Sequence, residues 1–281
     1  MPSTLIADSG STKTDWRLIS AEGKIAQAKT VGFNPYHQSS EDIAQKLQKE
    51  LLTQLSGEVT SIHFYGAGCS TESACQTVKD ALIGLFPNSQ VQVYNDLLAA
   101  ARALCGHQPG IACIIGTGAN SCQYDGKEIV DNVPPLGYIM GDEGSATWLG
   151  KQLLNSYFKR WMPDELKAPF EKRFSPSAGD TLEQVYRQPQ ANRYLAQFSR
   201  FAFHHLKHPW VAKLVYSGFD EFFDKNIVRY PDFQQLPIHF TGGVAFYYSN
   251  LLRQVANDRG VRVQNILESP IAGLTLFHQN Q

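Results

Sequence analysis

Two loops rich in glycine and hydroxyl side chains carry the residues best suited to chemistry on a phosphate group. The first follows the apolar stretch at residues 5–7 and opens with Asp8, a carboxylate of the kind that holds a hydrated divalent cation. A glycine lets the backbone turn tightly towards a ligand, and successive N–H groups in such a turn form an anion-binding nest. The phosphate-binding candidates in this loop are Ser9, Gly10, Ser11, Thr12, Lys13 and Thr14.

A second copy of this pattern lies at residues 111–129. An apolar strand, a Gly/Thr loop and a polar–apolar strand recur in the same order, followed by a turn at Gly126 and a third strand. Neither loop matches the Walker A pattern G-x-x-x-x-G-K-[ST]. Each loop alone could be an ordinary turn, but two spaced strand–loop–strand hairpins predict two similar domains that face one nucleotide. The candidates in the second loop are Gly116, Thr117, Gly118 and Asn120.

Three acidic residues stand where α/β folds bind ligands or where helices begin. Asp96 ends an apolar strand, the edge at which open sheets bind ligands, although it equally suits a helix cap. Asp142 and Glu143 lie between two glycines before a long helix. The helix dipole alone would explain both, but the stretch also suits a loop that presents a carboxylate to a polyhydroxylated ligand. Gly242–Gly243, after a strand, permits close backbone contact with a planar group such as adenine.

Histidines, aromatic residues and cysteines elsewhere are better explained by packing. The histidines at 204, 205 and 208 have apolar neighbours, and no carboxylate or cysteine nearby completes a metal site. The five cysteines include no C-x-x-C pair and are odd in number, which argues against a disulfide framework and predicts buried thiols in a reducing cytosol. The aromatic residues expected in the core are Phe219, Phe222, Phe223 and Tyr230.

The composition describes a chain that can bury a core and has no strongly charged surface. It has 281 residues, of which 43% are hydrophobic, and a formal net charge of −1. That length suggests one large domain or two modest ones, and the charge argues against nucleic acid as a partner. The N-terminus lacks a basic segment, and no apolar run approaches the roughly 18 residues of a membrane span. We expect a cytoplasmic protein with no membrane partner.

Hydrophobic periodicity in the first third predicts the order strand–strand–strand–helix–strand–helix–strand–helix. A helix over 39–55 starts behind a capping box at Ser39 and Asp42. Strands at 61–65 and 91–94 lead into helices at 71–85 and 97–105. Hairpin-linked strands followed by βα units predict an α/β fold with a mixed sheet flanked by helices.

The rest of the chain begins in the same way and then departs. A helix follows Ser145, and a helical elaboration spans 163–237. The expected domains are residues 1–108 and 109–281, and the closing helix could pack back on the first. The helical elaboration is expected to break at Pro169, Pro176, Pro189 and Pro209. The last expected elements are a strand at 238–241, a turn at 242–244, a helix at 248–256, a strand at 261–263 and a helix opened by Pro270.

Seven short motifs occur in an order that spans most of the chain outside the helical elaboration. They are Asp8–Thr14, Gly32–Pro35, Gly66–Gly68, Asn95–Asp96, Gly116–Asn120, Gly141–Ser145 and Gly242–Val244. In these motifs the sequence resembles the sugar-kinase, Hsc70 and actin superfamily, and within it the N-acetylglucosamine kinases grouped with the BadF/BadG/BcrA/BcrD ATPases. One departure concerns the first loop, which in the family commonly has two glycines before threonine. Ser11 replaces the second glycine, which bears on the backbone geometry of the loop.

The resemblance implies two RNase H-like domains of the actin-like ATPase type, with ATP and Mg²⁺ in the cleft between them. The two loops would bind the phosphates, Gly242 and Gly243 the adenosine, and Asp8 the Mg²⁺ through water. Asp96 would be the catalytic base that accepts the proton of the sugar's primary hydroxyl. The sugar-binding residues would be Asn34, Gly68, Asp96, Asp142 and Glu143.

The expected activity is ATP-dependent phosphorylation of an amino sugar, most simply N-acetylglucosamine. Two alternatives stay open. One is a BadF-type ATPase that activates a dehydratase or reductase, and such relatives carry an iron–sulfur cluster on cysteines. Cys69, Cys105 or Cys122 could serve there, but none belongs to a paired motif. The other is a non-catalytic sugar sensor, which would usually bring a DNA-binding module. Whether the chain forms a homodimer also stays open.

Overall fold

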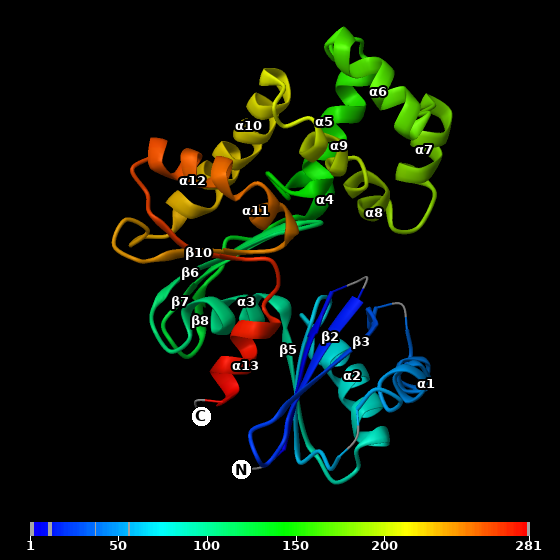
Figure 1. Cartoon of the computed structure of the whole chain (residues 1–281), viewed down its shortest axis with the longest axis vertical. Coiled ribbons are helices and arrows are strands. Elements are labelled where there is room, and N and C mark those ends of the chain that lie inside the picture. Colours follow the sequence, from blue (N-terminus) through cyan, green and yellow to red (C-terminus); the bar gives the residue numbers. More distant parts are fainter. Residues whose placement is uncertain (1–2, 11–12, 37, 56, 280–281) are drawn as a thin grey trace. The chain divides into compact units, whose positions relative to one another are not determined.

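The computed structural model describes residues 3–10, 13–36, 38–55 and 57–279. The chain separates into two compact units (Figure 1). The first comprises Met1–Gln108, Gly126–Ile129 and Ser269–Gln281, and the second comprises Pro109–Asp125 and Val130–Glu268. Each unit contains one five-stranded sheet.

The sheet of the first unit is mixed because its first three strands form hairpins and its last two follow helices. The strand order is β3-β2-β1-β4-β5, with β2 antiparallel to β1 and β3, and β4 parallel to β1 and β5. The strands are β1 (Thr4–Ser9), β2 (Lys13–Ile19), β3 (Ile25–Val31), β4 (Ser61–Gly66) and β5 (Gln90–Asn95).

Alternation along β1 sends its side chains to two separately covered faces. Leu5 and Ala7 pack with residues of α1 (Ser40–Glu50) and α2 (Glu72–Leu85). Ile6 packs with residues of α3 (Asp96–Cys105) and α13 (Ile271–Gln279). By the same alternation, Asp8 belongs to the face that α3 and α13 cover.

The second unit repeats the hairpin and then adds strands in parallel. Its strand order is β10-β9-β6-β7-β8, with β6 antiparallel to β7 and parallel to β9, and β9 parallel to β10. These strands are β6 (Gly110–Ile115), β7 (Ala119–Tyr124), β8 (Ile129–Asp131), β9 (Ile238–Thr241) and β10 (Val263–Leu267).

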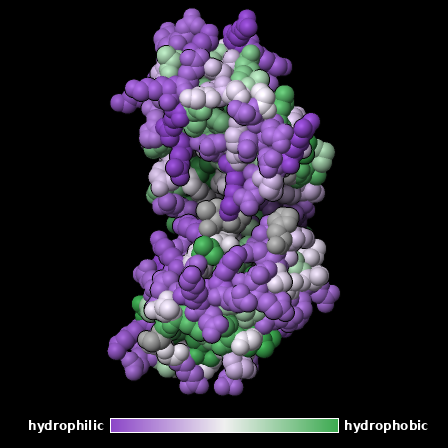
Figure 2. Space-filling model, turned by 90° about the vertical axis from the view of Figure 1, so that its right-hand side faces the viewer, coloured by the Kyte–Doolittle hydropathy of each residue, from purple (hydrophilic) through white to green (hydrophobic). Residues whose placement is uncertain are grey.

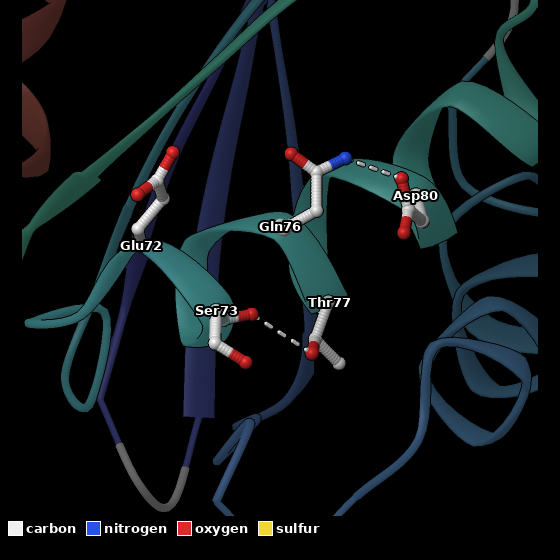
Figure 3. Close-up of a pocket in the computed structure, with 5 residues that line it drawn as sticks. All are labelled: Glu72, Ser73, Gln76, Thr77 and Asp80. Carbon is white, nitrogen blue, oxygen red and sulfur yellow. Dashed lines mark hydrogen bonds between the residues drawn. The ribbon is translucent and has the colours of Figure 1, made fainter.

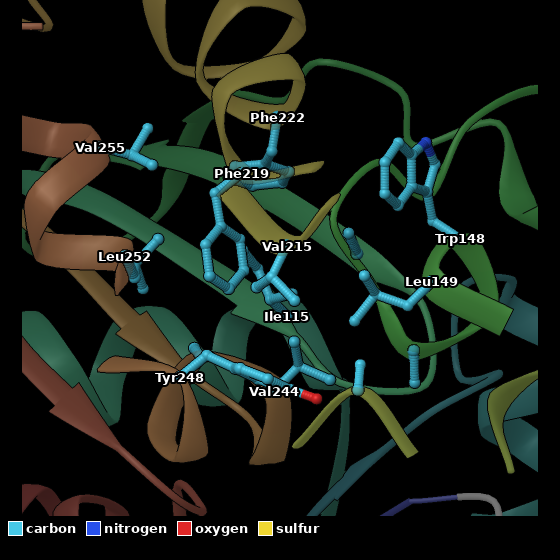
Figure 4. Packing of buried hydrophobic residues seen from close by; sticks show 14 of the residues in the cluster. Ile115, Trp148, Leu149, Val215, Phe219, Phe222, Val244, Tyr248, Leu252 and Val255 are labelled. Carbon is cyan, nitrogen blue, oxygen red and sulfur yellow. The ribbon is translucent and has the colours of Figure 1, made fainter. Parts of the chain in front are cut away.

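The helices of the second unit pack on one large apolar cluster. Figure 4 shows part of it, where Phe219 and Phe222 lie among Leu149, Val215 and Leu252. The aromatic residues expected in the core are there, each at most 1% exposed. The helices are α4 (Gly137–Met140), α5 (Ala146–Phe158), α6 (Asp164–Phe174), α7 (Ala178–Tyr186), α8 (Ala191–Ala196), α9 (Ser199–His204), α10 (Pro209–Lys225), α11 (Gly243–Tyr247) and α12 (Ser249–Asp258), with a short 3₁₀ helix at Ile227–Arg229.

The predicted order of elements in the first third is confirmed, including the capping box at Ser39 and Asp42. Four details were wrong. The helix expected over 39–55 ends at Glu50. Pro169 lies inside α6, because burial of Leu166 and Phe170 on either side of it holds the helix despite one missing N–H. The last strand spans Val263–Leu267 instead of 261–263, and it pairs with β9 through an irregular register. The expected turn after Gly242 is the start of α11.

The remaining sequence candidates take part in packing. The ring of His205 stacks on Phe201 at 4.0 Å between centroids, and His208 Nδ1 accepts a hydrogen bond from the backbone N–H of Trp210 as the cap of α10. All five cysteines are free thiols, and Cys69, Cys113 and Cys122 are buried. Across the described ranges, no helix is both long and apolar enough to span a membrane. The face in Figure 2 is mostly hydrophilic, with scattered hydrophobic residues.

Candidate active site

Asp8 is the second-last residue of β1, and its surroundings oppose its ionisation. Its Oδ2 accepts a hydrogen bond from the hydroxyl of Ser269 at 3.0 Å. The pKa of Asp8 is raised to about 7, mainly by burial and also by the charges of Asp15 and Asp96, against the opposing effects of Ser269 and Lys13. A cation beside this carboxylate would favour its ionised form.

Asp96 is the first residue of α3, but it is not the cap of that helix. Asn95 is the cap, and its Oδ1 accepts the backbone N–H of Leu98 at 2.8 Å. Burial raises the pKa of Asp96 to about 6, with backbone N–H groups of Leu97 and Asp96 itself opposing the shift. Asp96 therefore combines a position at a strand end with a proton affinity close to that needed of a base at neutral pH.

The first hairpin loop is held by its own hydroxyl groups. Ser9 Oγ and Thr14 Oγ1 are buried and lie 2.8 Å apart, and Thr14 also donates to the carbonyl of Val31. Gly10 N–H donates to Lys13 O at 3.0 Å, and the Lys13 ammonium pairs with Asp15 at 2.9 Å. These bonds hold the two ends of the hairpin loop together. The candidates Ser11 and Thr12 lie outside the described residues.

Asn34 and Gly68 lie together in the first unit. Asn34 Oδ1 accepts the backbone N–H of Tyr36 at 3.0 Å, an Asx turn that orients the amide. Gly68 has a φ of +84°, and a Cβ there would come within 3.2 Å of Asn34 Oδ1. The structure therefore places these two sugar-site candidates next to each other, and the backbone conformation at 68 favours glycine.

The second loop is bonded to the segment that begins α5. Gly116 N–H donates to Gly118 O at 2.9 Å, which closes a tight turn with Thr117 exposed at its tip. Gly116 O and Thr117 O accept the N–H groups of Ala146 and Thr147 at 2.9 and 3.1 Å. The loop and the start of α5 therefore form one hydrogen-bonded structure.

Asp142 adds a side-chain bond to the same loop. Its Oδ1 accepts the N–H of Ala119 at 3.0 Å, and a Cβ at Gly118 would lie 2.9 Å from that oxygen. Asp142 has a φ of +59°, so this aspartate is held in a conformation that favours glycine or asparagine. Burial raises its pKa, while the Ala119 amide and the Lys151 charge lower it. One phosphate-loop candidate and one sugar candidate are thus adjacent within the second unit.

Glu143 and the glycine pair complete the candidates of the second unit. Glu143 is 8% exposed and lies 3.3 Å from the ammonium of Lys225. Gly242 has a φ of +109°, and a Cβ there would lie 2.5 Å from Ile115 O, so only glycine fits between β9 and β6. A Cβ on Gly243 would meet nothing closer than 3.9 Å. Asn120 Oδ1 accepts from Ser121 N–H and Asn132 Nδ2, so this amide braces the hairpin.

Three residues that interact with the candidate carboxylates were not predicted from the sequence. Ser269 bonds Asp8, Lys225 pairs with Glu143, and Lys151 faces Asp142. Each is distant in sequence from the residue it contacts or lacks any motif, so periodicity and spacing carry no signal for it.

The donor set around Asp8 fits a hydrated magnesium ion. Within the described ranges, no group of three His, Cys, Asp or Glu side chains could hold a metal alone. Mg²⁺ keeps several waters and needs only one or two carboxylates when phosphate oxygens supply the rest. Asp8, which is hydrogen-bonded by Ser269 and repelled by the charges of Asp15 and Asp96, is the carboxylate that a cation would stabilise.

A surface hollow elsewhere does not belong to the site. It has a volume of about 460 Å³ and lies along the exposed face of α2, lined by Glu72, Ser73, Gln76, Thr77 and Asp80 (Figure 3). Within it, Gln76 bonds Asp80 and Thr77 bonds the carbonyl of Ser73. None of the candidate site residues lines it.

The class of protein follows from the two sheets and their hairpin loops. The fold is that of the actin-like ATPases, with two mixed five-stranded sheets flanked by helices. Two solved structures show the same fold at low identity. EutJ from Carboxydothermus hydrogenoformans, an ethanolamine utilization protein, has a TM-score of 0.53 and 17% identity over 99% of this chain and 90% of its own. A non-polymerising MamK variant bound to AMPPNP has a TM-score of 0.52 and 13% identity over 98% and 97%.

Within that class, the chain belongs to the BadF/BadG/BcrA/BcrD ATPase family, whose model matches residues 7–274. It is similar to a candidate N-acetylglucosamine kinase from Porphyromonas gingivalis, with 43% identity and a TM-score of 0.93 over 99% of each chain. A candidate N-acetylglucosamine kinase from Chromobacterium violaceum shares the fold at 16% identity, with a TM-score of 0.75 over 99% of each chain. The comparison with curated proteins found no match.

Proposed function

We propose that this protein is an ATP-dependent kinase that phosphorylates the primary hydroxyl of an amino sugar, with N-acetylglucosamine as its substrate. The observation that carries the proposal is Asp96, a carboxylate at a strand end that is not needed as a helix cap and whose pKa is raised to about 6. Membership of an ATPase family and 43% identity to a candidate N-acetylglucosamine kinase support the nucleotide and the sugar.

In the proposed reaction, the sugar oxygen attacks the γ-phosphorus of ATP and Asp96 accepts the hydroxyl proton. A bond forms between that oxygen and the phosphorus, the bond from phosphorus to the β–γ bridging oxygen breaks, and ADP leaves. Such transfers depend on positioning and charge stabilisation more than on covalent chemistry by the protein. The loops at 9–14 and 116–120 would donate hydrogen bonds to the phosphate oxygens.

The remaining roles are assigned from the residues that surround these groups. Asp8 would hold Mg²⁺ through water, and the bound ion would neutralise charge on the phosphates. Asn34, Gly68, Asp142 and Glu143 would contact the sugar. The backbone at Gly242 and Gly243 would lie against the adenosine.

The test is an ADP-release assay with Mg²⁺-ATP and a panel of glucosamine, N-acetylglucosamine and N-acetylmuramate. We expect ADP release that depends on N-acetylglucosamine. ³¹P and ¹³C NMR of the product should place the phosphate on the primary hydroxyl of the sugar. ATP hydrolysis that no sugar accelerates would favour an ATPase activator. Sugar binding without turnover would favour a sensor, and either outcome would overturn the kinase assignment.

A further inference from the structure

The turn that precedes Asp142 has few contacts to hold it. It contains α4, a helix of four residues with no buried residue and no side-chain cap. Leu136, Ile139 and Met140 are 58%, 75% and 70% exposed, and half-buried Tyr138 packs against the core. Leu136 has a φ of 58°, a backbone conformation unfavourable for leucine. A turn with so little buried surface needs polar restraints to keep one conformation.

Lys151 supplies such a restraint from the second turn of α5. Its side chain is half-buried, and its Nζ donates a hydrogen bond to the carbonyl of Tyr138 in α4. The same ammonium faces the carboxylates of Asp142 and Glu143. It also faces Glu221 and Lys225, two residues of α10. Lys151 therefore bonds the backbone of the turn and also compensates the charge of the two carboxylates that follow it.

Two further bonds hold Asp142, one to the turn itself and one to the second phosphate loop. Asp142 N–H donates to Pro135 O at 3.3 Å, and Asp142 Oδ1 accepts from Ala119 N–H at 3.0 Å. A Cβ at Gly141 would lie 2.0 Å from Pro135 O, so the backbone of the turn passes against itself with no space for a side chain. The orientation of Asp142 therefore depends on where the turn is held.

We propose that Lys151 is a positioning residue for sugar recognition, which holds the turn at 135–141 so that Asp142 and Glu143 keep the orientation that binds the sugar. This inference rests on the proposed function for the identity of the ligand. Lys151 acts through the loop and does not contact the reacting atoms.

The charge of Lys151 gives the proposal a distinctive pH signature. The groups that face Asp142 are Lys151 on α5, Glu143 on its own loop and the amide of Ala119. Lys151 and the amide lower the pKa of Asp142, whereas Glu143 and burial raise it. Without the Lys151 charge, Asp142 protonates at higher pH. The acidic limb of sugar affinity should then move to higher pH, a change that loss of packing alone would not cause.

The experiment compares Lys151→Met, which removes donor and charge at similar length, with Lys151→Arg, which keeps both. Lys213→Met is the matched control, because Lys213 is an exposed lysine of α10. Two quantities are measured on the full chain: amide hydrogen exchange of residues 135–144 without ligand, and the Kd of N-acetylglucosamine without nucleotide at several pH values. For Lys151→Met we expect faster exchange in this segment and a Kd raised about tenfold, which corresponds to one lost hydrogen bond of a charged group. Lys151→Arg should restore most of both.

Three results would overturn the inference: unchanged exchange in Lys151→Met, faster exchange with an unchanged Kd and pH profile, or an equal loss in Lys151→Arg. The Kd measurement does not depend on turnover. If the protein binds the sugar but does not phosphorylate it, the kinase assignment is contradicted, and the Kd values of the variants still test the role of Lys151. A wild-type protein that binds none of the tested hexosamines would overturn both.

Discussion

Replacing Asp96 with asparagine tests the proposed chemistry most directly. The substitution keeps the size of the side chain and removes the proton acceptor. Asn95, not Asp96, caps α3 by accepting the N–H of Leu98 at 2.8 Å. The helix should therefore begin as before in the variant, and an effect on turnover can be separated from an effect on folding.

The expected magnitude follows from the two possible roles of the carboxylate. If Asp96 is the general base, its loss should lower kcat by roughly 10²–10⁴-fold, which is about 3–5 kcal/mol of transition-state stabilisation. If it serves the structure alone, kcat should stay close to that of the wild type. The free energy of unfolding should not fall in either case, because the cap is retained and because burial already disfavours the ionised form of Asp96 in the folded state.

The assay is steady-state ADP release with N-acetylglucosamine, accompanied by the Kd of each substrate and the Tm. Asp80→Asn, at an exposed position of α2, is the control for the same chemical change. The wild-type kcat should fall as pH decreases below about 6, because protonation removes the base. An Asp96→Asn variant that folds, binds both substrates and turns over near the wild-type rate would remove Asp96 from the mechanism.

Three further predictions concern nucleotide, sugar and stability. Thr117→Ala at the exposed tip of the second loop should raise the KM for Mg²⁺-ATP several-fold with an unchanged Tm, and equal ATP kinetics in variant and wild type would refute its assignment. Asn34→Ala should raise the sugar KM far more than the ATP KM, since loss of the amide would leave the sugar's polar groups unpaired; equal increases in both would indicate a structural role. Asp8 has a folded-state pKa of about 7 against an ordinary value of 3.8, so the folded state binds the proton more tightly and Asp8 lowers stability as pH rises through that interval. Asp8→Asn should therefore flatten the fall in Tm between these pH values, as measured by scanning fluorimetry without Mg²⁺, whereas a slope equal to that of the wild type would contradict the raised pKa.

Local patterns in the sequence were sufficient to predict most elements of this fold. The recurring apolar strands and Gly/Thr loops predicted both hairpins, and the box at Ser39 and Asp42 predicted where α1 begins. These features depend on neighbours within a few residues, such as a side chain that caps the nearest N–H groups or an alternation that follows the pleat. The same motif order predicted the ATPase family.

Predictions failed where a local preference was weaker than packing. Pro169 lacks a backbone donor and was expected to end a helix, yet α6 continues through it because Leu166 and Phe170 are buried on the adjacent turns. The start of β10 was misplaced by two residues because its pairing partner β9, not its own composition, determines which residues are bonded. Sequence periodicity contains no information on such a partner.

Tertiary structure alone decided the electrostatics of the candidate site. The sequence left Asp96 open between cap and base, and the bond from Leu98 to Asn95 assigned the cap to its neighbour. Ser269 reaches Asp8 from 261 residues away, and Lys151 faces Asp142 from a different element. The raised pKa values of Asp8 and Asp96 arise mainly from burial. Burial and long-range contacts depend on how the whole chain folds, so residue types and spacing could name the carboxylates but could not determine their proton affinities or the groups that position them.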